Sequence, residues 1–292
     1  MRKQKNRNGV TMISFLIPFV IASIFNSGCS KDESTPTDPL TADSLQIAGY
    51  QLIWDDEFNG AEIDKSKWEH EVNGHGGGNN ELQYYTDRAE NSFIQNGKLV
   101  IAALQEEYTG DDGTRYYTSA RLRTANKGDW KYGRLDIRAK LPYGQGLWPA
   151  IWMLPTDWSY GGWPTSGEID IMELLGQEPD KVYGTLHYGG STSGHQSNGG
   201  SLKLSSGSFA ATFHTFTIEW EENVMRWYVD DHLFYTSNEW STDEASYPAP
   251  FDQRFHLILN VAVGGNWPGN PTTETIFPQK MEVEYVRVYK KK

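Results

Sequence analysis

Cysteine, cationic side chains and long apolar runs are all scarce in this 292-residue chain. Its one cysteine, Cys29, excludes a disulfide within the chain and makes thiol chemistry improbable. Asp and Glu number 38 against 26 Lys and Arg, and the formal net charge of −12 disfavours nucleic acids and other polyanions as partners. After residue 25, no segment approaches the about 20 apolar residues that a transmembrane helix needs.

Several motifs of enzyme chemistry are also missing. The glycine-rich segment 74–78 lacks the lysine and hydroxyl of a phosphate-binding loop, and segment 190–194 has Thr where a nucleophile elbow has Ser. The seven histidines are scattered, without a His-Glu-x-x-His pattern. Nucleotide hydrolysis, zinc catalysis and serine-hydrolase chemistry are therefore disfavoured.

Residues 1–28 have the pattern of a secretory signal peptide. Basic residues precede the apolar stretch 10–25, which is too short to span a membrane comfortably. Ser27-Gly28-Cys29 resembles a bacterial lipobox, which predicts cleavage before Cys29 and its lipidation, although Asn26 stands where leucine is usual. Residues 30–33 resemble the tag that sends some lipoproteins to the outer face of the Gram-negative outer membrane. We expect a surface lipoprotein, anchored only through Cys29; ordinary secretion with a chance cysteine is the alternative.

The rest of the chain divides into a tether and one domain. Residues 29–47 are mostly Ser, Thr, Pro and Asp, which predicts a flexible tether. Residues 48–292 suit one large all-β domain, with no sustained 3.6-residue period and no internal repeat. We expect a monomeric antiparallel β-sandwich, one sheet of which curves into a groove. The predicted strands are short segments between turn signals, most of which alternate apolar and polar residues: 98–103, 133–141, 216–220, 225–229, 233–235 and 281–289.

Three carboxylates interrupt a short apolar segment, Glu168-Ile169-Asp170-Ile171-Met172-Glu173, which turn residues flank on both sides. In a strand, Glu168 and Asp170 share one face, but strict alternation points Glu173 into the opposite, apolar face. An unpaired carboxylate there is costly. A β-bulge near Ile171-Met172 returns Glu173 to the acidic face, and we predict that bulge.

The bulged spacing suits a pair of catalytic carboxylates. The two glutamate backbones would lie roughly 13 Å apart at about 3.3 Å per residue. On a concave sheet, their carboxyl groups could approach to about 5 to 6 Å, which fits a retaining glycosidase better than the roughly 6.5 to 9.5 Å of an inverting one. A solvated acidic face and a metal site of three carboxylates remain alternatives; no Lys or Arg lies between Gly167 and Asp180 to pair these acids.

Aromatic side chains are abundant, with 11 Trp and 16 Tyr. Such numbers exceed what a core of Leu, Ile and Val needs, and flat rings in a cleft stack on sugar faces. Trp148 and Trp152 lie on the same face of a predicted strand, whereas Trp163 and Trp267 lie in Gly/Pro-rich loops. For any one of these rings, packing in the core is the alternative.

The hexapeptide at 168–173 resembles the bulged signature of glycoside hydrolase family 16, and its flank 163–167 resembles the laminarinase-like branch. The resemblance implies a concanavalin-like jelly-roll β-sandwich with a concave substrate cleft. It also implies endo-hydrolysis of internal β-1,3, and mixed β-1,3/1,4, bonds of β-glucan with retention and without a catalytic cofactor. Further matching segments extend along the domain: 54–60, 80–86, 119–124, 148–155, 264–269 and 283–289.

The resemblance also assigns residues. Glu168 is the nucleophile, Glu173 the general acid/base, and Asp170 the carboxylate between them. Positions that match sugar-binding residues of the family are Asn80, Arg121 and His187 for hydrogen bonds, and Trp148, Trp152, Trp163 and Trp267 for stacking. A strand-end structural role for His187 and charge balance for Arg121 are alternatives. A structural Ca²⁺ on the convex side is implied at Glu57, Gly97 and Glu284, the last of these being Asp in many relatives.

Two other functions remain open at this level. The same family includes hydrolases of agar, porphyran and carrageenan, although no basic loop suited to a sulfated galactan is conspicuous near the motif. A non-catalytic glycan-binding lipoprotein could use the same sandwich, but loss of one catalytic glutamate would be expected. Both glutamates are present.

Overall fold

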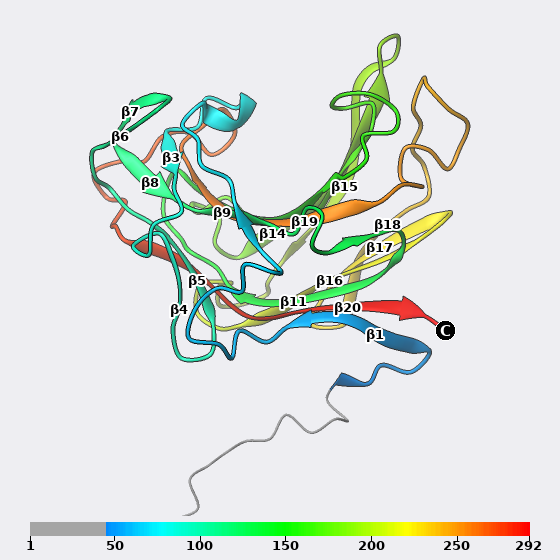
Figure 1. The fold of residues 1–292 in the computed structure, drawn as a ribbon, viewed down its shortest axis with the longest axis horizontal. Coiled ribbons are helices and arrows are strands. Elements are labelled where there is room, and N and C mark those ends of the chain that lie inside the picture. The colour runs from blue at the N-terminus through cyan, green and yellow to red at the C-terminus, as the bar shows by residue number, and fades with distance from the viewer. Residues whose placement is uncertain (1–44) are drawn as a thin grey trace, which may run out of the picture. The chain divides into compact units, whose positions relative to one another are not determined.

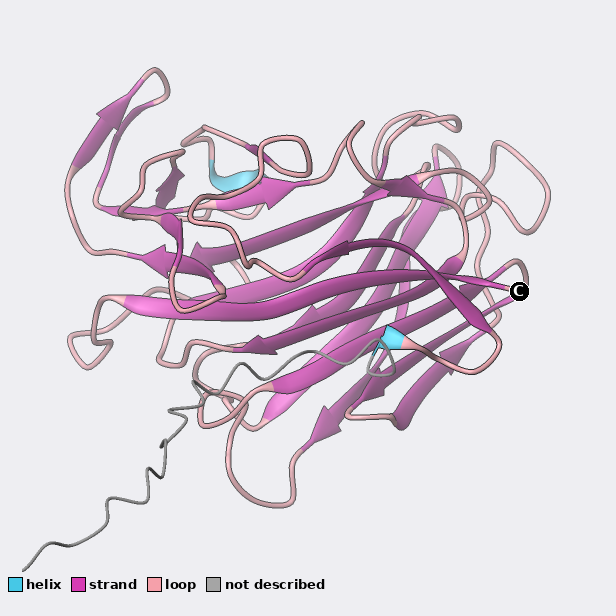
Figure 2. Cartoon of the chain, turned by 60° about the horizontal axis from the view of Figure 1, so that its bottom comes forward, coloured by secondary structure: helices cyan, strands magenta, loops and turns pink. Residues whose placement is uncertain are grey.

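The computed structural model describes residues 45–292; the predicted signal peptide, the lipidation position Cys29 and most of the predicted tether lie outside them. The described chain forms two eight-stranded antiparallel sheets that stack as two curved layers (Figures 1 and 2). The predicted jelly-roll β-sandwich is thereby confirmed. Within these residues no helix is long and apolar enough to cross a membrane.

The first sheet includes the C-terminal strand at its centre. Its order is β18-β17-β16-β11-β20-β5-β4, and β1 shares one edge of the long strand β20 with β5. The bounds are β1 Tyr50–Asp56, β4 Ser92–Ile94, β5 Leu99–Ala103, β11 Gly133–Lys140, β16 His214–Glu221, β17 Val224–Val229, β18 His232–Ser237 and β20 Gln279–Lys291.

The second sheet presents the face that matters for function. Its order is β15-β14-β13-β12-β19-β9-β2, and β10 pairs with β19. The bounds are β2 Glu69–His70, β9 Arg121–Arg123, β10 Asp129–Trp130, β12 Leu147–Pro155, β13 Glu168–Glu173, β14 Lys181–Gly190, β15 Gly194–Lys203 and β19 Phe255–Val263.

Small elements extend one end of the second sheet (Figure 1). The parallel pair is β3 Gln83–Tyr85 with β8 Tyr117–Ser119, and the hairpin pair is β6 Tyr108–Gly110 with β7 Gly113–Arg115. A 3-10 turn, η2 Gly76–Gly78, precedes β3. These elements place the loop 76–82 beside the outer face of the second sheet (Figure 1).

One apolar core lies between the two sheets, and strand alternation explains it. Leu135, Ile137 and Ala139 of β11 are completely buried in this core, and the residues between them are mostly polar. All the predicted strands are found within one or two residues of the expected bounds. The turn between β17 and β18 places Asp230 and Asp231 at φ 48° and 63°, a left-handed conformation that Asp tolerates in tight hairpins.

Candidate active site

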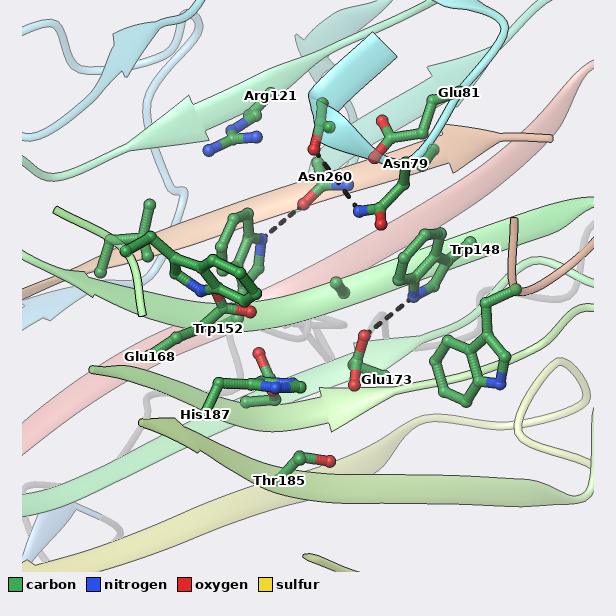
Figure 3. A pocket seen from close by; sticks show the side chains of 18 of the residues that line it. Asn79, Glu81, Arg121, Trp148, Trp152, Glu168, Glu173, Thr185, His187 and Asn260 are labelled. Carbon is green, nitrogen blue, oxygen red and sulfur yellow. Dashed lines mark hydrogen bonds and ion pairs between the residues drawn. The ribbon is translucent and has the colours of Figure 1, made fainter. Parts of the chain in front are cut away.

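A cleft of about 540 Å³ lies on the outer face of the second sheet (Figure 3). Strand alternation decides what lines it: in β19, Leu257, Leu259 and Val261 enter the core, whereas Asn260 and Ala262 face the cleft. Strands β9, β12, β13, β14 and β15 contribute further side chains, and loops contribute Trp158, Trp163 and Trp267.

The predicted β-bulge is present in β13. Trp152 pairs with Asp170 and Ile151 with Met172, so Ile171 has no partner on β12. On the other side, Ile171 and Met172 together face a single residue of β14, Gly184, and both apolar side chains are buried. The added residue returns Glu173 to the face of Glu168 and Asp170, and all three acids line the cleft. Figure 3 labels the two glutamates.

Trp227 supports this bulge from inside the sandwich. Its indole Nε1–H donates to the carbonyl oxygen of Asp170 over 2.8 Å, which occupies a backbone acceptor at the bulge. A Cβ at Gly184 would lie 2.4 Å from Cδ1 of Trp227, so glycine is required where the indole passes under the strand. Sequence and packing therefore agree on the position of the bulge.

The acids are not a solvated surface. Asp170 is 2% exposed and Glu173 9% exposed, which argues against the solvated acidic face considered from the sequence. Two tryptophans hold the glutamates: Trp163 Nε1–H donates to Glu168 Oε2 over 2.8 Å, and Trp148 Nε1–H donates to Glu173 Oε1 over 3.0 Å. The carboxylates therefore have defined orientations in the cleft.

Asp170 differs from the two glutamates because its buried Oδ2 accepts no hydrogen bond from the described protein. Nε2 of His187 lies 3.1 Å away, at ion-pair distance but without aligned hydrogen-bond geometry. Glu168, Asp170 and His187 each offer one atom that could ligate a metal ion, and these three atoms lie within 4.8 Å of one another. This set differs from the three-carboxylate metal site considered above. Because the indole of Trp163 already bonds Glu168, we interpret it as a hydrogen-bonded acidic cluster.

Burial and crowding raise the pKa values of all three acids. Burial, and then the charge of Asp170, raise the pKa of Glu168 to about 8, and burial raises that of Asp170 to about 7. Burial also raises the pKa of Glu173 well above its usual range, and Glu173 alone feels the charges of both Asp170 and Glu168. The cluster therefore retains protons at neutral pH, and this asymmetry favours Glu173 as the protonated member.

The four predicted stacking tryptophans all line the cleft. Trp163 and Trp267 are 49% and 40% exposed, so their rings are available to a ligand. Trp267 meets Trp148 edge to face at 5.4 Å between ring centroids. Trp152 is held by its Nε1–H bond to Asn260 Oδ1, 2.7 Å long (Figure 3), and by the guanidinium of Arg121, 4.6 Å from its ring.

The three predicted polar contacts are placed differently. Arg121 and His187 line the cleft, and Arg121 also pairs with Glu71 over 3.0 Å. Asn80 is not among the lining residues: its left-handed backbone, φ 58°, directs its amide to Asn266 Oδ1 over 2.9 Å. Its neighbours Asn79 and Glu81 line the cleft instead.

Several cleft residues escaped the sequence analysis, namely Trp158, Tyr85, Glu81, Thr185, His195 and Asn260. Asn260 had a usable signal, because it is a single amide in the otherwise apolar run Leu257–Val263. Tyr85 OH accepts from Asn260 and donates to Glu81, which links these residues into one network beneath Trp152. His195 had no signal, since β15 shows no apolar alternation.

The two acidic residues of the expected calcium site form ion pairs with arginines. Both carboxylate oxygens of Glu57 accept from Arg287, over 2.7 and 2.9 Å, and Glu284 accepts from Arg138 over 2.6 Å. Gly97 offers only its backbone. Each of the two carboxylates is thus paired with an arginine, and calcium at this position stays a prediction.

Comparisons with known proteins identify the family of the chain. Residues 61–287 match the family model described as glycosyl hydrolases family 16. The chain is 49% identical over 254 residues to the beta-glucanase of Rhodothermus marinus, covering 82% of this chain and 85% of that protein. It is 46% identical to glucan endo-1,3-beta-glucosidase A1 of Niallia circulans, covering 88% of this chain but only 39% of that longer protein.

A solved structure shows the same fold. The catalytic domain of an endo-1,3-beta-glucanase from Thermotoga petrophila superposes with a TM-score of 0.75 at 44% identity, covering 84% of this chain and all of that one. The residues that match the family model, 61–287, contain the bulged strand β13, the whole cleft lining and every strand of the two sheets except β1 and the end of β20. The chain belongs to glycosyl hydrolases family 16.

Proposed function

We propose that this chain is a retaining endo-hydrolase of β-glucan that cleaves internal β-1,3 glucosidic bonds. The observation that supports this most strongly is the bulged strand β13, which directs Glu168 and Glu173 into one aromatic cleft. The relatives named as β-1,3-glucanases point to the same polymer.

In the first step, Glu168 attacks the anomeric carbon while Glu173 gives its proton to the departing glycosidic oxygen. The indole N–H of Trp163 holds one oxygen of Glu168, which leaves the other free for attack. Burial and the two neighbouring carboxylates keep a proton on Glu173 at neutral pH, as a general acid requires.

In the second step, the same groups reverse their roles. Esterification removes the negative charge of Glu168, and with it one of the charges that raise the pKa of Glu173. Glu173, which lost its proton in the first step, is then stable as a carboxylate and takes a proton from the water that attacks the anomeric carbon, while Glu168 departs as a carboxylate. Asp170 lies beside Glu168 in both steps, with oxygen atoms of the two side chains within 4.8 Å of each other.

Aromatic platforms on both sides of the acids favour cutting within a polymer. Trp163 bonds Glu168, and Trp158 lies in the same loop, whereas Trp267 contacts Trp148 next to Glu173. A chain that extends past both glutamates would therefore find stacking surfaces in each direction. We infer that mixed β-1,3/1,4-glucan also binds in this way.

The experiment is a substrate panel with two active-site variants. Wild-type protein should release reducing ends and a series of oligosaccharides from laminarin, with or without activity on mixed-linkage glucan. Glu168→Gln and Glu173→Gln should reduce turnover of laminarin below a few per cent while retaining binding. Release of reducing ends from agarose or carrageenan, but from neither glucan, would show that the substrate is a galactan. Full activity of Glu168→Gln would reject Glu168 as the nucleophile.

We also propose that the mature chain is a monomer held at the outer membrane through lipid on Cys29. The lipid anchor rests on the sequence of residues 26–33 alone. Cys29→Ala should move the protein from the membrane to the soluble fraction and abolish incorporation of labelled fatty acid. Incorporation that survives the substitution would reject the anchor. Light scattering of the tag-free protein tests the monomer.

A further inference from the structure

A second histidine completes the wall of the cleft next to Glu168. His195 on β15 lies diagonally across from His187 on β14, because His187 pairs with Ser197 two residues further along. His187 Nδ1 and His195 Nε2 are 2.8 Å apart, a hydrogen-bond distance. His195 also contacts Trp163, with 4.7 Å between ring centroids. It therefore touches both residues that flank Glu168 and Asp170.

The position of the acids decides which nitrogen of His187 holds the proton. Nε2 of His187 lies 3.1 Å from the buried Oδ2 of Asp170. At this distance a lone pair on Nε2 would repel the carboxylate, whereas an N–H there attracts it even without aligned hydrogen-bond geometry, so we assign the proton of His187 to Nε2. Nδ1 is then an acceptor. The partner at 2.8 Å, His195 Nε2, must be the donor.

We propose that His195 is a positioning residue for the nucleophile: its Nε2–H bonds His187 Nδ1 and so keeps the proton of His187 on Nε2, beside Asp170 and Glu168. The inference rests on the proposed retaining hydrolysis. An N–H beside the acidic cluster favours the ionised form of Glu168, which is the form that attacks.

The surroundings of His187 support this role. The titratable groups that face it are Glu168, Asp170 and Glu173 on β13 and His195 on β15. Burial lowers the pKa of His195, which keeps that ring neutral with a single N–H to give. No cationic side chain of the described residues forms an ion pair with Glu168 or Glu173.

Two substitutions of His195 distinguish the effect of its N–H donor from the effect of its aromatic ring. His195→Gln keeps an N–H near the position of Nε2 and loses the ring, whereas His195→Phe keeps the ring against Trp163 and loses the donor. For His195→Phe, loss of one hydrogen bond should lower kcat on laminarin about five- to tenfold, with KM changed less than about twofold. The acid limb of kcat/KM should move to higher pH. His195→Gln should stay within about twofold of wild type.

His232→Phe is the matched control, since His232 is exposed on β18 and remote from the cleft lining, and it should change nothing. Long-range ¹⁵N–¹H correlation spectra of wild type should show His187 with its proton on Nε2, and that tautomer should be lost or mixed in His195→Phe. The spectrum of wild type decides even if both variants misfold.

Three results would overturn the inference. The first is a His195→Phe variant whose kcat, KM and pH profile equal those of wild type. The second is an equal loss of kcat in His195→Gln and His195→Phe. The third is a wild-type spectrum in which the proton of His187 is on Nδ1. Turnover by Glu168→Gln would instead reject the proposed nucleophile, and the tautomer measurement would still test His195. The two failures are therefore distinguishable.

Discussion

Replacing Glu168 by Gln should stabilise the protein while abolishing catalysis, and the gain should depend on pH. The pKa of Glu168 is raised from 4.5 to about 8 in the folded chain. Between these values the folded state binds the proton more tightly than the unfolded state, so the stability of wild type falls as pH rises through this window. Glutamine has no proton to lose and still accepts the N–H bond of Trp163.

The magnitude follows from about 1.4 kcal/mol per pH unit. Between pH 4.5 and pH 7, ionisation of Glu168 in the unfolded state lowers the free energy of unfolding of wild type by at most about 3 kcal/mol. Because the Glu168 side chain is partly exposed in the folded state, we reduce this figure to about 2 kcal/mol. For a domain of this size, Glu168→Gln should therefore melt about 4 to 8 °C above wild type at pH 7 to 8. At pH 4.5 the difference should nearly vanish.

The assay is urea or thermal unfolding of wild type and Glu168→Gln at pH 4.5, 6, 7 and 8. Glu107→Gln is the control, because Glu107 is exposed and outside the cleft lining. A variant that is equally or less stable than wild type at pH 8, or a gain that does not change with pH, would refute the crowding of carboxyl groups described here.

Two further substitutions test the supports of the acids. Trp148→Phe removes the indole N–H that lowers the pKa of Glu173, so the basic limb of kcat should move up by less than about 1 pH unit, measured on laminarin; a downward shift would contradict the assignment. Gly184→Ala places a methyl group 2.4 Å from Trp227 and should cost about 1 to 3 kcal/mol in urea unfolding. Unchanged stability would show that the bulge does not need this glycine.

The central strand could be predicted from the sequence because its conflict is local. Strict alternation would have buried Glu173 among apolar side chains, and only an added residue at Ile171-Met172 resolves this, as the register shows. The strands at 225–229 and 233–235 were predictable for a similar reason, since both are local segments and the short turn at Asp230-Asp231 joins them.

The rest of the site depends on distant pairing. Contact between Asp170, His187 and His195 requires the register of three strands, which no local pattern encodes. Asn79 lines the cleft in place of the predicted Asn80 because the backbone of Asn80 is left-handed. Asn260 was hidden because one amide in an apolar strand has no meaning until Trp152 and Tyr85 are placed beside it.

The most direct test of the account is identification of the covalent intermediate. Wild-type protein is incubated with a 2-deoxy-2-fluoro laminaribioside that has a good leaving group, digested, and analysed by mass spectrometry. The account predicts one glycosyl ester, on Glu168, with loss of activity in proportion to labelling. An ester on Glu173, or no adduct on a protein that hydrolyses laminarin, would contradict double displacement through Glu168.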